Sequence, residues 1–214
     1  PDSVLSVGDA AFYNCDSLTS ITIPENVSLI GGYAFGNCNS LASIIIPESV
    51  SSIGDRAFFD TPWLEEQRKK SPFVIINNIL VDATICEGDI TIPDDISSIA
   101  GGAFWDCKSL TSITIPNSIS SISDSAFELC GSLSNITILD GVSSIGNYAF
   151  CDCRKLTGNL TIGNNVKKIG ECAFYLCRGL TGDLKIPNTV ETIGNNAFGY
   201  CIGLTGNLTI GNNV

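Results

Sequence analysis

The sequence predicts a right-handed solenoid of short parallel β-strands, with short helical turns on the opposite face of each coil. Two observations lead to this prediction. One pattern of residues recurs along the whole chain, and within each unit a strand-like half alternates with a half of near-helical spacing. A single unit of this kind cannot bury its apolar side chains alone, so neighbouring units must stack.

The repeat is defined by three residue types at fixed positions. Counted from a Val or Ile, Ala stands four residues later, Phe five later and Leu eleven later in every unit. The unit starts are Val7, Ile30, Ile53, Ile99, Ile122, Ile145, Ile169 and Ile193. Successive starts are 23 or 24 residues apart, except for one step of 46. We therefore expect residues 1–214 to form a single repeat array with an irregular double-length unit at 53–98.

The strand-like half has the sequence L-T-S-I-T-I at residues 18–23 and its counterparts. Leu18, Ile21 and Ile23 are predicted to point inward, and the β-branched composition favours a short strand. Proline follows this segment in five units, as at Pro24, and ends the strand because it has no N–H to donate. The other half, G-D-A-A-F-Y-N-C at residues 8–15, is long enough for one or two turns, and we expect a short α or 3₁₀ turn there.

The double-length unit contains a charged run and a hairpin signal. Asn77 and Asn78 lie between two apolar, β-rich runs, and both residue types tolerate positive φ. Because 46 is twice 23, the segment is expected to replace one whole coil without loss of phase. One interpretation makes it a protruding contact element; the other, which we favour, makes it a degenerate repeat with a solvated helix face. The candidate contact residues are Trp63, Arg68, Lys69 and Lys70.

Seven of the ten cysteines share one position, eight residues after the unit start. They are Cys15, Cys38, Cys107, Cys130, Cys153, Cys177 and Cys201. Thiolate metal sites usually contain paired C-x₂₋₄-C ligands, and a disulfide framework belongs to small domains that lack a core. We therefore expect a buried, reduced ladder and no metal, while one disulfide among Cys86, Cys151 and Cys172 remains open.

Composition excludes several classes of function. The chain has no histidine, which rules out imidazole-based catalysis and His-ligated metal sites. Its net charge of −11 argues against nucleic acid or an anionic membrane as the main partner. No apolar run is long enough to span a bilayer, and no phosphate-binding or nucleophile motif is present. We expect no catalytic residue and no cofactor.

The outward strand positions form columns of polar residues and provide the candidate binding face. Solenoids commonly bind partners through such an extended surface, although Thr is also simply a good, soluble strand former. The candidate residues are Thr19, Ser20, Thr22, Ser43, Ile45, Ser112, Thr114, Asn135, Thr137, Thr161, Lys185 and Thr209. Charge is uneven along the array, since residues 1–55 contain six acidic residues and no Lys or Arg, whereas six of the eleven basic residues lie between positions 154 and 185.

The unit A-F-x-x-C-x-x-L-x-x-I-x-I-P resembles the 23-residue leucine-rich repeat of BspA-type bacterial surface proteins over nearly the whole chain. The resemblance implies a leucine-rich-repeat solenoid in a secreted or cell-surface adhesin that binds host matrix proteins and host cells, and the hydroxyl columns of the outward face could also suit a glycan. The asparagine of the broader leucine-rich pattern is present at Asn26 but replaced at most equivalent positions, so varied polar turns are expected there.

The resulting hypothesis is a non-catalytic binding module that recognises a macromolecule through its sheet face. The alternatives are a structural spacer that presents another domain and, with far less support, a carbohydrate-active enzyme. Both ends of the sequence fall inside a repeat with no polar capping unit, so we expect the chain to be a segment of a longer array.

Overall fold

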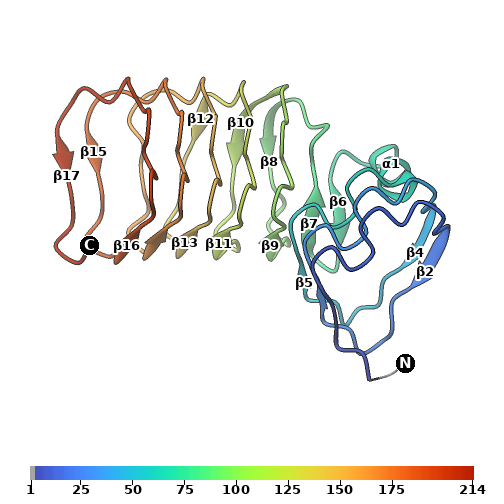
Figure 1. Ribbon diagram of the computed structural model, residues 1–214. Coiled ribbons are helices and arrows are strands. Elements are labelled where there is room, and N and C mark those ends of the chain that lie inside the picture. The colour runs from blue at the N-terminus through green and yellow to red at the C-terminus, as the bar shows by residue number, and fades with distance from the viewer. Residues whose placement is uncertain (1–2) are drawn as a thin grey trace.

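The computed structural model describes residues 3–214 and shows a stack of successive coils (Figure 1). Each regular coil has three sides: two parallel strand segments and one segment of turns. Strands in successive coils pair in parallel, unit on unit, as at Val7 with Ile30 and Ser20 with Ser43. The predicted solenoid of stacked parallel strands is confirmed.

Two rows of strands run along the stack. The row predicted from L-T-S-I-T-I, here called the long row, consists of β2 (Ser20–Thr22), β4 (Ser43–Ile45), β8 (Gly88–Thr91), β10 (Leu110–Thr114), β12 (Asn135–Ile136), β15 (Leu184–Lys185) and β17 (Leu208–Thr209). The second row, here called the short row, was not predicted. It consists of β1 (Ser6–Val7), β3 (Leu29–Ile30), β5 (Ser52–Ile53), β7 (Ile79–Asp82), β9 (Ser98–Ile99), β11 (Ser121–Ile122), β13 (Ser144–Ile145), β14 (Lys168–Ile169) and β16 (Thr192–Ile193).

The third side of each coil consists of consecutive β-turns. In the first coil, the N–H groups of Ala11, Tyr13 and Cys15 donate to carbonyls three residues earlier, which is the spacing of a 3₁₀ turn. The intervening N–H groups donate instead to the next coil, as from Ala10 to Gly32 at 2.8 Å. Ala10 and Asn14 have positive φ, 52° and 62°. The expected α or 3₁₀ turn is therefore met in hydrogen-bond spacing but not as a continuous helix.

Residues 53–98 contain two coils of unequal length. Leu80 in β7 pairs with Ile99 in β9, and the N–H of Ala83 donates to the carbonyl of Ala103 at 2.7 Å. The thiol of Cys107 donates to the carbonyl of Cys86 at 3.1 Å. Leu80 therefore begins this extra coil, and Cys86 lies beside the cysteine ladder although its sequence position is off-phase.

The insertion before Leu80 contains a helix and a hairpin. Helix α1 (Pro62–Arg68) is capped at its N-terminus by Thr61, whose hydroxyl accepts the N–H of Leu64. Strand β6 (Val74–Ile76) then pairs antiparallel with β7 through Asn77 and Asn78, whose φ values are 49° and 62°. The predicted hairpin and the predicted helical charged run are both confirmed.

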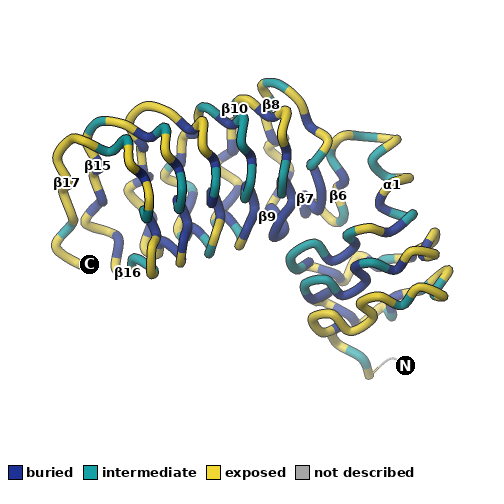
Figure 2. Tube along the Cα trace, turned by 45° about the horizontal axis from the view of Figure 1, so that its top comes forward, coloured by how far each residue is buried: buried dark blue, intermediate teal, exposed yellow. Residues whose placement is uncertain are grey.

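The core contains stacked phenylalanine rings but is divided at the insertion. Rings of successive coils lie nearly parallel, as for Phe127 and Phe150, with centroids 5.1 Å apart at 2°. The stack stops at Phe58, against which Trp63 packs, and resumes at Phe104. Buried residues accordingly fall into two clusters, and the N-terminal coils are set at an angle to the rest (Figures 1 and 2).

Candidate binding face

The long row presents its polar side chains outward because its apolar side chains are anchored in the core. In β10, Leu110 and Ile113 are buried, Thr111 and Thr114 are exposed, and Ser112 is half-buried. Parallel pairing then aligns equivalent positions of successive coils, as for Ser112 with Asn135. Together, this burial pattern and the pairing place the columns predicted from the sequence on one surface.

The central part of this surface has a hollow between β10 and β12. Its volume is about 270 Å³, and its lining includes Ser112, Thr114, Asn135 and Thr137 together with apolar groups such as Leu139. Thr114, Asn135 and Thr137 are exposed, and Ser112 is half-buried. The four polar side chains offer hydroxyl and amide groups that both donate and accept hydrogen bonds, and no charged side chain lines the hollow.

The N-terminal candidates form a separate patch on β2 and β4. Thr22 pairs with Ile45, and the Ile45 side chain is 60% exposed. Thr19, Ser20 and Ser43 are also exposed. The coils before Leu80 form one block and the remaining coils another; the insertion and the angle between these two blocks separate β2 and β4 from β10 and β12 (Figure 1).

The C-terminal candidates Thr161, Lys185 and Thr209 are all exposed. Lys185 and Thr209 are paired in β15 and β17, whereas Thr161 lies in a coil in which residues 159–161 form no strand. An extra residue enters the repeat here, and the glycines at 158 and 182 adopt φ values of 76° and 75°. The twelve candidates therefore lie in separate patches, and the structure brings four of them together around one hollow.

The candidate protruding residues are only partly available for contact. The Trp63 ring packs on Phe58 with centroids 4.9 Å apart, and the Arg68 side chain is 16% exposed. Arg68 donates to both carboxylate oxygens of Asp82, at 2.9 and 2.8 Å. These two side chains thus contribute to the fold, while Lys69 and Lys70 at the end of α1 are exposed.

Asp89 belongs to the same surface and was not among the sequence-based candidates; Thr91, which the sequence pattern places in the column of Thr22 and Thr114, belongs to it too. Asp89 pairs with Ser112, Thr91 pairs with Thr114, and the Thr111 hydroxyl donates to the Asp89 carboxylate at 2.6 Å. Both residues lie in the extra coil. Thr91 and Asp89 lie eight and ten residues before Ile99, just as Thr114 and Ser112 lie before Ile122, so the columns are found by counting back from the next unit start and not forward from Leu80.

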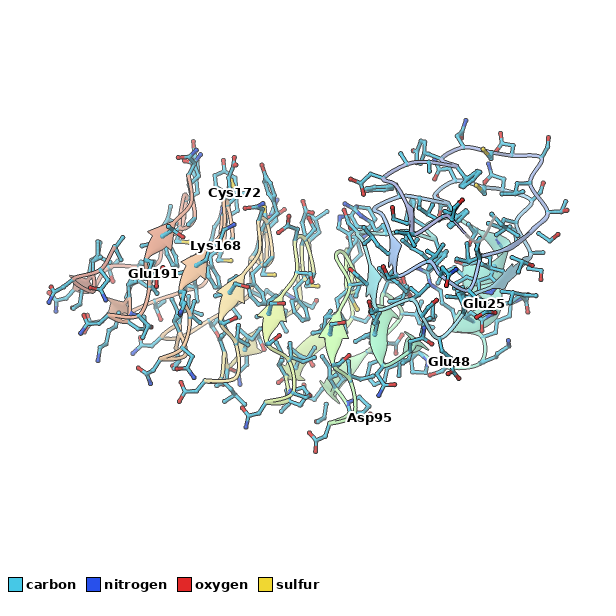
Figure 3. All side chains as sticks on the ribbon, turned by 90° about the horizontal axis from the view of Figure 1, so that it is seen from below. Glu25, Glu48, Asp95, Lys168, Cys172 and Glu191 are labelled. Atoms are coloured by element: carbon cyan, nitrogen blue, oxygen red, sulfur yellow. The ribbon has the colours of Figure 1, made fainter. Side chains whose placement is uncertain are left out.

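Charge differs between the two halves of the stack. Glu25, Glu48 and Asp95 lie on the N-terminal half, whereas Lys168 and Glu191 lie on the C-terminal half (Figure 3), and the six basic residues between positions 154 and 185 are all exposed. The basic residues are not all free, since Arg154 donates to both oxygens of Asp152, and this hydrogen bond together with the nearby charge raises the pKa of Arg154. The predicted asymmetry of charge along the array is present on the folded surface.

The family model described as "BspA type Leucine rich repeat region" matches residues 1–79 and 83–205, in six copies. The chain belongs to the BspA-type leucine-rich repeat family. The match spans both blocks of coils and stops only briefly within β7, so the irregular segment interrupts the repeat without ending it. No match was found among curated proteins.

Several solved structures resemble this member of the family. A leucine-rich repeat protein of T. pallidum is 25% identical, with 72% of each chain covered and a TM-score of 0.41. A leucine-rich cell surface protein of Faecalibacterium prausnitzii is 21% identical, covering 98% of this chain and 77% of that one, with a TM-score of 0.44. The pneumococcal vaccine antigen PcpA is 16% identical, covering 97% and 71%, with a TM-score of 0.47.

Within residues 3–214, no helix is both long and apolar enough to cross a membrane. The same residues contain no group of three or more cysteine or carboxylate side chains arranged to hold a metal ion.

Proposed function

We propose that this BspA-type array is a recognition module of a secreted or cell-surface protein, and that it binds an extracellular protein or a glycan through the outward surface of its long row. The location outside the cell rests on membership of the family. The observation that supports the binding role is the hollow formed by Ser112, Thr114, Asn135 and Thr137 between β10 and β12.

The chemistry of this hollow suits a neutral polar ligand surface. Hydroxyl and amide groups can match either donors or acceptors, and the apolar lining adds area that a partner can cover. The hollow carries no charge of its own, so affinity is expected to come from hydrogen bonds and shape. Lys185 and the basic C-terminal coils would orient the partner along the stack.

The proposal is tested by screening the chain against immobilised matrix proteins and a glycan panel. The variant combines Thr114→Arg with Thr137→Arg, which fills the hollow from two adjacent coils. The control combines Ser120→Arg with Ser143→Arg, which are exposed residues on the same two coils outside the long row. Circular dichroism would establish that both variants keep the fold.

A partner that binds the unmodified chain and the control, and is lost with the variant, is the expected result. Equal binding by the variant would contradict the proposal. Because single contacts of this kind can be weak, the screen should include a dimerised form of the chain, in which two sites bind together.

A further inference from the structure

The long row is broken between β4 and β8, which leaves β8 as an edge strand. β8 pairs in parallel with β10 on one side, and no strand within residues 3–214 pairs with its other side. β4 likewise pairs only with β2. The break coincides with the insertion of α1 and β6, which replaces the long-row strand that a regular coil would supply (Figure 1).

The open edge presents backbone groups of Asp89 and Thr91. The N–H of Ile92 donates to the carbonyl of Thr114 at 3.1 Å and therefore points toward β10. Successive residues of a strand point their backbone groups to opposite sides, so the N–H and carbonyl groups of Thr91 and Asp89 point toward the break. Unpaired groups of this kind are a template for an added strand.

An apolar hollow of about 430 Å³ lies beside this edge. Its lining includes Pro72, Phe73, Ile85 and Ile90, and the side chain of Ile85 is 46% exposed. The thiol of Cys86 donates to the carbonyl of Pro72 at 3.6 Å, which fixes one wall of the hollow close to β8. The site thus combines a backbone edge with a place for an apolar side chain.

The surroundings of this edge are strongly acidic. Residues 71–107 contain no Lys or Arg, whereas Glu87, Asp89, Asp94 and Asp95 are all exposed. The nearest cations along the chain each have an acceptor: Lys69 and Lys70 donate to Glu66 and Gln67 of α1. Lys108, next to the Ser109 carbonyl that accepts the Gly88 N–H, pairs with Asp106 at 3.0 Å. Asp95 projects away from the ribbon into solvent (Figure 3).

We propose that the open edge of β8 receives an extended, basic segment of a partner protein as an added strand. Backbone hydrogen bonds to Asp89 and Thr91 would hold the segment, and one apolar side chain would occupy the hollow beside Ile85. Lysine or arginine on either side of that apolar residue would lie near Glu87 and Asp94. This site is separate from the hollow between β10 and β12 and does not depend on the function proposed above.

The probe is a fluorescent peptide in which lysine alternates with a central apolar residue, prepared with valine, leucine or phenylalanine. Two further forms carry N-methyl groups on alternate backbone nitrogens. In strand addition only one set of N–H groups faces β8, so one methylated form should bind and the other should not. A peptide with glutamate in place of lysine should not bind.

Two protein variants test the site by independent means. Ile85→Asp removes the apolar wall, and Thr91→Pro removes an edge N–H that β10 does not use, a position where proline is tolerated. Each is expected to weaken binding by about tenfold or more. The matched control is Ile202→Asp, which also replaces an exposed isoleucine, 71% exposed, in the last coil. Thermal unfolding would show that all three variants keep the fold.

Saturable binding with this pattern, and slower amide exchange at Asp89 and Thr91 in the complex, would support the proposal. It would be overturned if none of the three lysine peptides bound saturably, if both methylated forms bound equally, or if Ile85→Asp and Ile202→Asp bound alike. Self-association of the unmodified chain that Ile85→Asp abolished would also overturn it, because a second copy would then be the occupant of this edge.

Discussion

The thiol of Cys153 donates a hydrogen bond to the backbone carbonyl of Phe127, one coil earlier, at 3.1 Å. The same bond joins Cys130 to Phe104 and Cys177 to Phe150, at 3.0 and 3.1 Å. The cysteine ladder therefore links successive coils as well as filling space. A small buried side chain with one weak donor meets both needs.

Replacement of Cys153 by alanine should lower the free energy of unfolding by about 1–3 kcal/mol, since it leaves a small cavity and removes the thiol donor. Cys153→Ser should lower the free energy of unfolding by less, because the serine hydroxyl can still donate to the carbonyl of Phe127. Thr61 occupies the equivalent position in the third unit, and its hydroxyl is buried there and donates to the carbonyl of Phe58 in its own coil at 2.8 Å. Urea unfolding of both variants is the measurement.

Cys15→Ala provides the control for that series. Cys15 is half-buried, and no carbonyl of an earlier coil lies beside it within the described residues. Its replacement should change stability by less than about 0.5 kcal/mol. A loss as large as that of Cys153→Ala would show that the bond between coils is unimportant.

Thiol labelling should distinguish one cysteine from the other nine. All ten are free in the structure, and only Cys15 is not buried. A thiol-reactive dye should therefore modify Cys15 quickly in the folded chain and the others only after unfolding, because reaction needs an accessible thiolate. Mass spectrometry of the labelled peptides gives the site directly. Rapid labelling of Cys153 or Cys177 in the folded chain would contradict the buried ladder.

Stability should fall in alkaline solution. Burial raises the pKa of the Cys107 thiol to about 12 and those of Cys86 and Cys201 to about 11, from an ordinary value of 9.0. Below pH 9 these thiols are protonated in both states and contribute no pH dependence. Between pH 9 and 11 they ionise in the unfolded chain but not in the folded one, so the unfolded state binds fewer protons and becomes favoured.

Each such thiol should lower the folding equilibrium constant by up to about tenfold per pH unit in that interval. Urea unfolding at neutral pH, at pH 9 and at pH 11 measures the slope. Cys107→Ser should reduce it, because serine does not titrate there. An unfolding midpoint that stays constant up to pH 11 would contradict the assignment.

The ion pair between Arg68 and Asp82 joins α1 to the end of β7. Both side chains are largely buried, 16% and 8% exposed, and the hydrogen bond and charge of Asp82 raise the pKa of Arg68 even though burial acts in the opposite direction. Asp82→Ala should lower the free energy of unfolding by at most about 3 kcal/mol, because the largely buried guanidinium would keep only the exposed Glu65 carboxylate and the Thr84 hydroxyl as partners. Combining Asp82→Ala with Arg68→Met should recover part of that loss, as measured by urea unfolding. If the double variant recovered no stability, the unpaired charge of Arg68 would not be the cause of the loss.

The features of this fold that the sequence predicts depend on local patterns, whereas those that it does not predict depend on contacts between coils or leave too little pattern. The period, the long-row strands and the hairpin at Asn77 and Asn78 follow from local patterns. The positive φ of Ala10 does not, because it depends on an N–H bond from Ala10 to Gly32 in the next coil. The short-row strands were missed because most of them are only two residues long and leave little pattern in the sequence.

Part of the candidate surface was predictable from the sequence and part was not. Ser112, Thr114, Asn135 and Thr137 share columns in the sequence and lie together in the structure. The separation of Thr22 and Ile45 from them depends on the angle between the two blocks, which arises where the extra coil at Leu80 meets the insertion. No pattern of residues in the sequence predicts that angle.

The most direct test of the central claim is photo-cross-linking to a partner found by the binding screen. A benzophenone side chain would replace Thr114 in one sample and Ser120 in another, both exposed positions near β10 and β11. Binding through the long row predicts a covalent adduct from position 114 and none from position 120. An adduct from position 120 with none from position 114 would contradict it.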